Sequence, residues 1–394
     1  MRRQTPNAVP SQRSLTVSIV GFPNAGKSSL VNRLVGLPVC AVSSRSHFTR
    51  EQKTVAALVG DHCQLVLMDT PGLATPLSTE KLKMDKQGQR TSEAYMSATD
   101  RSLHQADLLL AVVDAFDAIK KGRVHHRLLH LLHRHAILPS VLVLNKVDLV
   151  PQERDLLELT RKMTGGVVGG SKAAPVARGA QQATSAERAK NSIGDRLINS
   201  GVQLDQLAPT DTPFVGLKRG LLEKKSSMMT PKELAVLFKD HQAWSNFDAV
   251  FYVSAETGDG CQDLLNYLAG RAKPRRWKYE RDFVTQKTPQ ETCVELVRAQ
   301  LADLLNVPER QLPYVVGIEV TNWAPMEDDP TCLQVAVTIR SPRKRWVPLL
   351  IGKQGAIVGP LAKTVGEQLK ELLQSEVQFK VYVIGPTPAS GDLS

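Results

Sequence analysis

Short hydrophobic runs alternate with segments of helical spacing along the first two thirds of the 394-residue chain. Each run has the length of a strand and ends in a polar turn, as buried parallel strands commonly do. The predicted strands are residues 15–20, 64–68, 106–113, 140–144 and 249–253, and a further strand at 54–60 that forms a hairpin with 64–68. Helical spacing is found at 30–35, 122–135, 152–163, 231–238 and 263–268. This alternation predicts an α/β fold with a doubly wound sheet, whose carboxyl edge carries the functional site.

The last third of the chain has a different order of elements. Its pattern predicts a helix at 289–305 capped by Thr288, strands at 313–323 and 333–340, the apolar run 349–351, a glycine turn, a helix from about Pro360 to Leu373, and a strand at 377–384. A small α+β domain is therefore expected to follow the doubly wound one.

Polar segments give the expected boundaries. These are a flexible tail at 1–14, the α/β domain at 15–270, a charged linker at 271–287, the α+β domain at 288–385 and a tail at 386–394. Residues 164–200 are rich in Gly, Ala, Ser and Gln and poor in large apolar side chains. Such a segment buries too little surface to offset its ordering entropy, so it is predicted to be a disordered insertion.

Composition narrows the class of protein. With 42% hydrophobic and 23% charged residues the chain is globular in type, and no apolar run is long enough to span a bilayer. The formal charge of +11 and a pI of about 9.4 predict an anionic partner, either RNA or an anionic membrane surface. The residues around 1–14 are basic and lack acidic side chains, which fits both a trimmed organellar transit peptide and an ordinary tail.

Cysteine and histidine give little support for metal sites. The five cysteines are Cys40, Cys63, Cys261, Cys293 and Cys332. They are scattered and form no C-x-x-C pair, which argues against a zinc site and against disulfides and favours a reducing compartment. His126 and His130 have the i,i+4 spacing of metal ligands, but no glutamate completes a hydrolase motif. A solvated helix face is favoured over zinc there.

A glycine-rich turn between the first strand and the first helix has the pattern G-x-x-x-x-G-K-[ST]. Such a turn directs backbone N–H groups and a helix N-terminus at one point, which suits phosphates. Lys27 is expected to reach the β- and γ-phosphates and Ser28 to bind Mg²⁺. The predicted nucleotide-binding residues of this segment are Gly21, Pro23, Asn24, Ala25, Gly26, Lys27, Ser28 and Ser29.

Two further segments are expected to sense the γ-phosphate. Thr49, with Thr54 in reserve, is the candidate switch hydroxyl for Mg²⁺. The strand at 64–68 ends in a D-x-x-G motif of Asp69, Thr70, Pro71 and Gly72, in which Asp69 is expected to hold the metal through water. Leu73 follows where many GTPases have a water-positioning glutamine, so hydrolysis is expected to be slow or to use another group.

Two motifs predict that the base is guanine. N-K-x-D at Asn145, Lys146 and Asp148 supplies a carboxylate that can accept both N1–H and the N2 amine of guanine, whereas adenine has no matching donors. The turn Ser254–Ala255–Glu256 follows the last strand, where the Ala255 N–H is expected to contact guanine O6.

The glycine turn of the last third predicts RNA binding. A GxxG turn between two helices lets the chain approach a single-stranded nucleic acid and clamp about four nucleotides. The order of elements matches a type II KH domain, and basic residues flank the turn. The predicted RNA-binding residues are Ile351, Gly352, Lys353, Gln354, Gly355, Arg343, Lys344 and Arg345.

Together these motifs resemble the Era family, P-loop GTPases with a C-terminal KH domain. The resemblance covers nearly the whole chain, and the long stretch between Asp148 and Ser254 resembles the form found in animal mitochondria. The family's T-T-R has become Phe48-Thr49-Arg50, which supports Thr49. Asn24 matches a position that holds K⁺ in related GTPases, so the resemblance implies K⁺ stimulation.

The resemblance implies a function as well. It implies hydrolysis of GTP to GDP with Mg²⁺, binding of the 3′ region of small-subunit ribosomal RNA, and a role in assembly of the small ribosomal subunit. The implied location is the mitochondrial matrix, with the cytoplasm as the alternative, and the protein is expected to be a monomer. Its basic charge leaves peripheral association with the anionic inner membrane open as well. Two alternatives remain open: another RNA-handling GTPase, for example in tRNA modification, and an RNA-binding scaffold whose nucleotide site is structural.

Overall fold

The computed structural model describes residues 12–43, 53–59, 62–73, 99–172, 229–239, 242–281, 283–305 and 312–386. Contacts within the chain divide it into two compact units. The first consists of Met1–Leu34 and Thr49–Phe283, and the second of Val35–Phe48 and Val284–Ser394.

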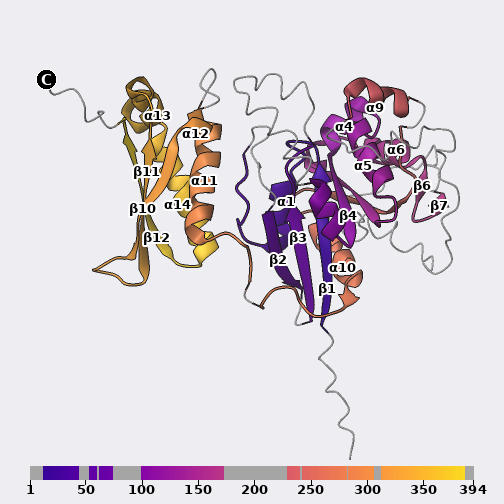
Figure 1. Ribbon diagram of the computed structural model, residues 1–394, viewed down its shortest axis with the longest axis horizontal. Coiled ribbons are helices and arrows are strands. Elements are labelled where there is room, and N and C mark those ends of the chain that lie inside the picture. The colour runs from indigo at the N-terminus through magenta and orange to yellow at the C-terminus, as the bar shows by residue number, and fades with distance from the viewer. Residues whose placement is uncertain are drawn as a thin grey trace, which may run out of the picture. The chain divides into compact units, whose positions relative to one another are not determined.

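The first unit is built on a sheet with the strand order β2-β3-β1-β4-β5-β8 (Figure 1). Except for β2, which pairs antiparallel with β3, the strands of this path are parallel. The strands are β1 Arg13–Gly21, β2 Lys53–Val59, β3 Cys63–Asp69, β4 Leu108–Asp114, β5 Ser140–Asn145 and β8 Phe247–Val253. These confirm the strands and the hairpin expected from the sequence. Because β1 lies between β3 and β4, the chain leaves β1 at the point where the strand order reverses, where such sheets bind ligands.

Helices connect the strands of this unit. They are α1 Lys27–Val35, α4 Ala115–Lys121, α5 His126–Arg134, α6 Glu153–Thr164, α9 Pro231–Leu237 and α10 Cys261–Gly270, with the 3₁₀ turn η1 Val147–Leu149. The strands are apolar, and their side chains pack against the helices, which buries the sheet. One core cluster joins Leu109 and Leu142 of the sheet to Leu128 of α5 and Leu159 of α6.

The segment predicted as one helix at 122–135 differs in the structure. An unpredicted helix, α4, ends at Gly122 with φ 61°, and α5 begins only at His126. The prediction of a solvated histidine face is also wrong: His130 is fully buried, and the His133 ring packs edge-on against Trp244, with ring centroids 4.6 Å apart. The leucine pattern of α5 located the helix but did not reveal that α9 and Trp244 cover its histidine side.

The first residues of the segment predicted to be a disordered insertion form regular structure. Residues 165–172 form a small hairpin of β6 Val167–Val168 and β7 Ser171–Lys172 directly after α6. Gly165, with φ 64°, ends α6, and the Gly169 N–H donates to the Phe247 carbonyl at 2.8 Å. The glycines therefore serve turns at this point. The remainder of the predicted insertion, 173–200, lies outside the described residues.

The first part of the predicted linker belongs to the first unit. β9, Lys273–Pro274, pairs antiparallel with β1. The Gln64 side chain accepts the Lys278 N–H at 3.0 Å, and Arg275 forms an ion pair with Asp107. The boundary between the two units falls at Phe283 and Val284, inside the segment expected to link them.

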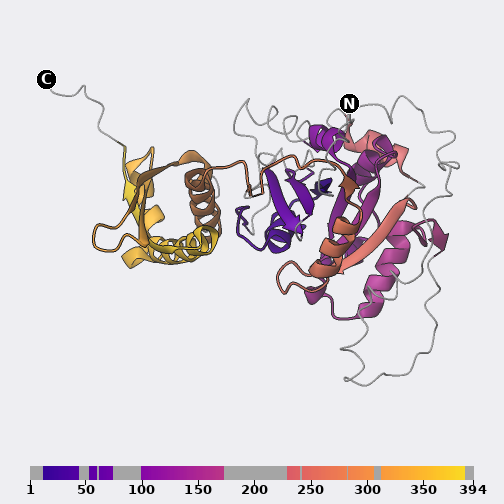
Figure 2. The ribbon, with the colours of Figure 1, turned by 90° about the horizontal axis from the view of Figure 1, so that it is seen from below.

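The second unit has a three-stranded sheet in the order β10-β11-β12, with β10 antiparallel and β12 parallel to β11. Figure 2 shows its long helices along one face of these strands. The elements are α11 Pro289–Leu304, α12 Leu312–Val315, β10 Gly317–Pro325, β11 Cys332–Arg340, η3 Lys344–Trp346, α13 Val347–Ile351, η4 Lys353–Gly355, α14 Val358–Leu373 and β12 Glu376–Ile384. The strand predicted at 313–323 begins only at Gly317, because a helical turn, α12, occupies its first residues.

A capped helix start and a common hydrophobic core stabilise the helices of this unit. Thr288 and Glu291 form a capping box at the start of α11, as the Thr288–Pro289 pair predicted. The core joins Leu296 of α11, Val337 of β11 and Leu361 of α14. Ala41, from the first stretch of this unit, is buried in the same core.

Candidate nucleotide site and nucleic-acid interface

The phosphate-binding turn lies where β1 ends and α1 begins, as predicted. Gly26 has φ +83°, and a Cβ atom there would lie 2.2 Å from the Asn145 Nδ2 atom. At Gly21 a Cβ atom would lie 2.2 Å from the Val112 carbonyl oxygen. Glycine is therefore required at both positions by close packing. The turn directs the N-terminus of α1 at the carboxyl edge of the sheet, which suits an anionic group.

Lys27 and Ser28 occupy the first turn of α1. Burial lowers the pKa of Lys27 from its usual value, and the neighbouring Asp69 carboxylate opposes that effect. The Lys27 Nζ atom donates to the Phe22 carbonyl at 3.1 Å. The Ser28 hydroxyl donates to the Asp69 Oδ2 atom at 2.6 Å. The two predicted magnesium ligands, from segments 41 residues apart, thus lie side by side.

The D-x-x-G segment is held against β1 by its own hydrogen bonds. The Thr70 hydroxyl donates to the Ile19 carbonyl at 2.7 Å, and the Leu73 N–H donates to the Gly21 carbonyl at 3.0 Å. A Cβ atom on Gly72 would lie 2.8 Å from the backbone nitrogen of Pro23. The Thr70 side chain therefore anchors the segment to the sheet, and Gly72 permits the two loops to touch.

Leu73 lies in the hydrophobic core. Its side chain is 0% exposed and belongs to the cluster that includes Val20 and Leu109. This explains in physical terms why the position differs from a water-positioning glutamine. A side chain directed into the core has no access to a water at the phosphates.

The residues predicted to recognise the base lie at the ends of β5 and β8. The Asn145 Nδ2 atom donates to the Ala25 carbonyl at 2.8 Å, and its Oδ1 atom accepts the Ala255 N–H at 3.0 Å. Asp148 and Glu256 are exposed, so the Asp148 carboxylate is accessible to a base. The Ala255 N–H already has a partner within the protein, and its expected contact with guanine O6 stays a prediction.

Two residues of this site were missed by the sequence analysis. Asp114, at the end of β4, forms an ion pair with Lys146 at 2.7 Å and caps α4 by accepting the Asp117 N–H at 3.1 Å. Arg33 of α1 donates from Nε to the Ala255 carbonyl at 2.9 Å. The signal for Asp114 was its position directly after the apolar run 106–113, and the structure places it in register with Asn145 at the same edge of the parallel sheet. Nothing in the sequence pattern indicated Arg33.

The structure brings together most of the predicted nucleotide-site residues at one edge of the sheet. The predicted residues of four segments lie at the carboxyl ends of their strands, either as the last residue of the strand or in the loop or helix start that follows: Gly21–Ser29, Asp69–Gly72, Asn145–Asp148 and Ser254–Glu256. Asn24 is exposed and has φ 64°. Thr49 and its reserve, Thr54, cannot be compared in this way: Thr49 lies outside the described residues, and Thr54 is described only as part of β2.

The predicted RNA-binding turn lies between α13 and α14. Gly352 has φ 76° and ψ 165°, and a Cβ atom there would lie 2.8 Å from the backbone nitrogen of Ile357. Gly355 and Gln354 also have positive φ, so the chain turns sharply and leaves Lys353 and Gln354 exposed. The turn thus exposes its backbone and one positive charge, as an approach to a nucleic-acid strand requires.

Sequence and structure comparisons place the chain among known proteins. The family model described as "50S ribosome-binding GTPase" matches residues 16–146, and the "Elongation factor Tu GTP binding domain" model matches residues 85–274. A relative from Salmo salar named "GTPase Era, mitochondrial" is 31% identical over 96% of this chain and 78% of its own length. The chain belongs to the Era family of GTPases.

Other members of the Era family support the same assignment. A Caenorhabditis elegans protein, also named "GTPase Era, mitochondrial", is 29% identical over 95% of this chain and 90% of its own length. A bacterial GTPase Era, from Sinorhizobium medicae, is 27% identical over 95% and 89%. The chain is therefore a GTPase, of the type that animals have in mitochondria.

The fold is also that of Era. A crystal structure of Era in complex with MgGDPNP and nucleotides 1506–1542 of 16S ribosomal RNA matches with a TM-score of 0.61 and 17% identity, covering 96% of this chain and 95% of that one. A structure of Aquifex aeolicus Era bound to GDP·AlF4⁻ matches with a TM-score of 0.60 and 19% identity over the same shares. Among the described residues, no helix has the length and hydrophobicity needed to cross a membrane.

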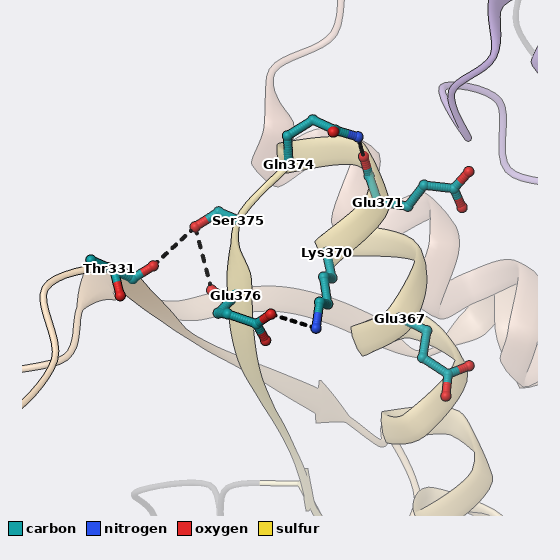
Figure 3. Close-up of a pocket in the computed structure, with 7 residues that line it drawn as sticks. All are labelled: Thr331, Glu367, Lys370, Glu371, Gln374, Ser375 and Glu376. Atoms are coloured by element: carbon teal, nitrogen blue, oxygen red, sulfur yellow. Dashed lines mark hydrogen bonds and ion pairs between the residues drawn. The ribbon is translucent and has the colours of Figure 1, made fainter.

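The surface of the second unit differs in charge between the two ends of α14. Arg343, Lys344 and Arg345 are exposed before α13, and the Arg343 guanidinium lies over the Trp346 ring at 4.8 Å. Figure 3 shows a hollow at the other end of α14. Its lining residues are Thr331, Glu367, Lys370, Glu371, Gln374, Ser375 and Glu376.

The acidic hollow does not suit a phosphate backbone. Three of its side chains are glutamates, and its lysine, Lys370, forms an ion pair with Glu376 at 2.5 Å. Because α14 has 16 residues, its far end lies about 24 Å from the glycine turn. The charge distribution therefore favours the GxxG end as the nucleic-acid face of this unit.

Proposed function

We propose that this Era GTPase binds the 3′ region of small-subunit ribosomal RNA through its second unit, and that GTP hydrolysis in the first unit times this binding during assembly of the mitochondrial small subunit. The observation that carries the proposal is the presence, in one chain, of a guanine-nucleotide site and a GxxG turn flanked by exposed basic residues. The fold similarity to an Era complexed with 16S ribosomal RNA supports the choice of RNA.

The site has the donor groups that magnesium prefers. The Ser28 hydroxyl and the Asp69 carboxylate are 2.6 Å apart beside the N-terminus of α1, and hard oxygen ligands of this kind suit Mg²⁺. Ser28 would hold the ion directly and Asp69 through water, with Thr49 completing the set. When bound, Mg²⁺ neutralises negative charge on the β- and γ-phosphates.

The residues of this chain supply binding and charge stabilisation rather than a base. The P-loop backbone and Lys27 would hold the phosphates, and Gly72 would present its N–H to the γ-phosphate. The buried Leu73 side chain cannot orient a water. We therefore expect slow intrinsic hydrolysis, which suits a timer of RNA binding.

The division of the chain supports a link between the nucleotide and RNA binding. The stretch Val35–Phe48 starts at the last residue of the P-loop helix and precedes Thr49, yet it belongs to the second unit. Within that unit Ala41 is buried in the core, and the Ser43 hydroxyl donates to Asp303 of α11 at 2.8 Å. A contact between Thr49 and bound Mg²⁺·GTP would thus act on the chain directly beside a segment that is anchored in the RNA-binding unit.

Crosslinking followed by RNA sequencing tests the choice of RNA. We expect the protein to crosslink in mitochondria to the 3′ region of small-subunit ribosomal RNA. A variant with Lys344→Ala, Arg345→Ala and Lys353→Ala should bind that RNA at least about tenfold more weakly and with a smaller salt dependence, because phosphate contacts are lost. Lys370→Ala, at the acidic end of α14, is the matched control and should bind as the wild type does.

Other outcomes of that experiment distinguish the alternatives. Enrichment of tRNA instead of small-subunit RNA would favour a GTPase of tRNA modification and would contradict the assembly role. GTP turnover of the wild type and of Lys27→Ala separates an enzyme from a scaffold. Loss of turnover in Lys27→Ala with RNA binding retained is expected of a GTPase switch.

Three further features of the proposal concern conditions and location. We include stimulation by K⁺, because Asn24 matches a position that holds K⁺ in related GTPases and its side chain is exposed at the phosphate loop. Equal hydrolysis rates in K⁺ and Na⁺ would contradict it. We place the monomeric protein in the mitochondrial matrix, where its basic surface permits peripheral contact with the anionic inner membrane. Fractionation of mitochondria with and without high salt tests that contact.

A further inference from the structure

The base-recognition turn at 254–260 is folded on itself by backbone hydrogen bonds. The Ser254 N–H donates to the Asp259 carbonyl at 2.9 Å, and the Gly258 N–H donates to the Ser254 carbonyl at 2.8 Å. The Ser254 hydroxyl accepts the Thr257 N–H at 3.1 Å. These bonds shape the turn internally, but they do not place it relative to the phosphate loop. That placement requires bonds to other elements.

Arg33 makes such bonds from the P-loop helix. Its Nε atom donates to the Ala255 carbonyl at 2.9 Å, and one of its terminal nitrogens donates to the Glu256 carbonyl. The two segments are 222 residues apart in sequence. Gly258, with φ +95°, lies beside the same guanidinium: a Cβ atom there would be 3.8 Å from the Arg33 Nη1 atom.

These contacts complete a chain of hydrogen bonds around the nucleotide site. The Ala25 carbonyl accepts from Asn145, Asn145 accepts the Ala255 N–H, and the Ala255 carbonyl accepts from Arg33. Arg33 lies on α1, the helix that continues from the phosphate loop. The turn is thereby held at its N–H side by β5 and at its carbonyl side by α1.

We propose that Arg33 is a positioning residue for guanine-nucleotide binding, which fixes the Ser254–Glu256 turn at the distance from the phosphate loop that one bound nucleotide spans. The guanidinium suits this role because its planar fork can donate to two carbonyls at once, whereas an ammonium group acts as a point donor. Arg33 makes no contact with the reacting phosphate in this role. Arg33 therefore affects the affinity for the nucleotide and not the rate of the chemical step.

The test is nucleotide release from the full-length protein, with fluorescent GDP as the probe. Arg33→Ala should release GDP about tenfold faster and raise the KM for GTP about tenfold, because it removes two charge-assisted hydrogen bonds. The value of kcat at saturating GTP should stay within about twofold of the wild type, since uniform binding is lost and not transition-state binding. Arg33→Lys should recover part of the affinity.

A matched control and a second variant keep the test decisive. Gln262→Ala removes an exposed side-chain hydrogen bond, to Asn266 at 3.0 Å, on the helix that follows the turn, and should leave GDP release unchanged. If Arg33→Ala does not fold, Arg33→Gln is measured in its place. A folded Arg33 variant with wild-type GDP release and wild-type KM overturns the proposal. A lowered melting temperature of the nucleotide-free protein with unchanged KM does so too, because it indicates a purely structural role.

Discussion

The side-chain amide of Asn145 donates to the Ala25 carbonyl at 2.8 Å, which joins the base-recognition strand to the phosphate loop. The same side chain accepts the Ala255 N–H at 3.0 Å and is 1% exposed. One residue thereby connects the two segments that we propose bind the two ends of a nucleotide. Removing a buried side chain that makes two such hydrogen bonds is costly in free energy, because its buried partner groups are left without a hydrogen bond and cannot reach water.

Replacing Asn145 by alanine should weaken GDP binding by about 30-fold to 160-fold, from the loss of two buried hydrogen bonds worth about 1–1.5 kcal/mol each. Equilibrium titration with fluorescent GDP measures the change. Asn322→Ala is a suitable control, since it removes one side-chain hydrogen bond, to Gln334 at 2.9 Å, in the other unit. Unchanged GDP affinity in Asn145→Ala would contradict the connecting role.

Removing the ion pair between Asp114 and Lys146 should weaken nucleotide binding less than Asn145→Ala does. Asp114→Asn keeps an acceptor for the cap of α4 but removes the negative charge that holds Lys146 at 2.7 Å. We expect the KM for GTP to rise about threefold to tenfold with little change in kcat. Asp117→Asn removes an exposed ion pair with Lys121 on the same helix and should leave the KM as it is.

The burial of Leu73 predicts that a glutamine there cannot restore fast hydrolysis. Leu73→Gln would place an amide in a hydrophobic cluster, and we expect it to lower the free energy of unfolding by about 2–4 kcal/mol. Single-turnover GTP hydrolysis should not accelerate, since the side chain is directed away from the nucleotide. A variant with wild-type melting temperature and at least tenfold faster hydrolysis would show that this segment rearranges in the GTP state.

The lowered pKa of the Asp107 carboxyl group predicts that the stability of the protein depends on pH. Partial burial alone would raise the pKa of this carboxyl group, but hydrogen bonds from Arg275 and the Thr16 N–H outweigh that effect and lower it. A carboxyl group with a lowered pKa in the folded state stabilises the protein above its unfolded pKa, and this contribution disappears as the pH falls through the folded value.

Chemical unfolding from about pH 7 down to about pH 3 measures this contribution. The wild type should lose stability more steeply than Asp107→Asn at the acidic end, and the two curves should converge there. Asp328→Asn, in an exposed loop of the second unit, should follow the wild type. Parallel curves for wild type and Asp107→Asn would show that the Arg275 pair contributes nothing that depends on the charge of Asp107.

The sequence by itself was sufficient to predict most of the residues of the proposed nucleotide site. Motifs such as Gly21–Ser28 are local: the glycines, the lysine and the hydroxyl act within one turn, so their spacing in the chain carries the information. The apolar runs before them located the parallel strands, because a strand buried on both faces has few polar residues. The GxxG turn and its basic flank were also local, so the sequence predicted them as well.

Only the tertiary structure revealed the long-range contacts. Arg33 and Ala255 are separated by 222 residues, and Asp107 meets Arg275 across 168. Such pairs leave no periodicity in the sequence, because they depend on the order in which strands lie in the sheet. The buried His130 and the core position of Leu73 were decided in the same way, by which other elements cover them. The sequence therefore determined the chemistry at each strand end, and folding determined which of those ends act together.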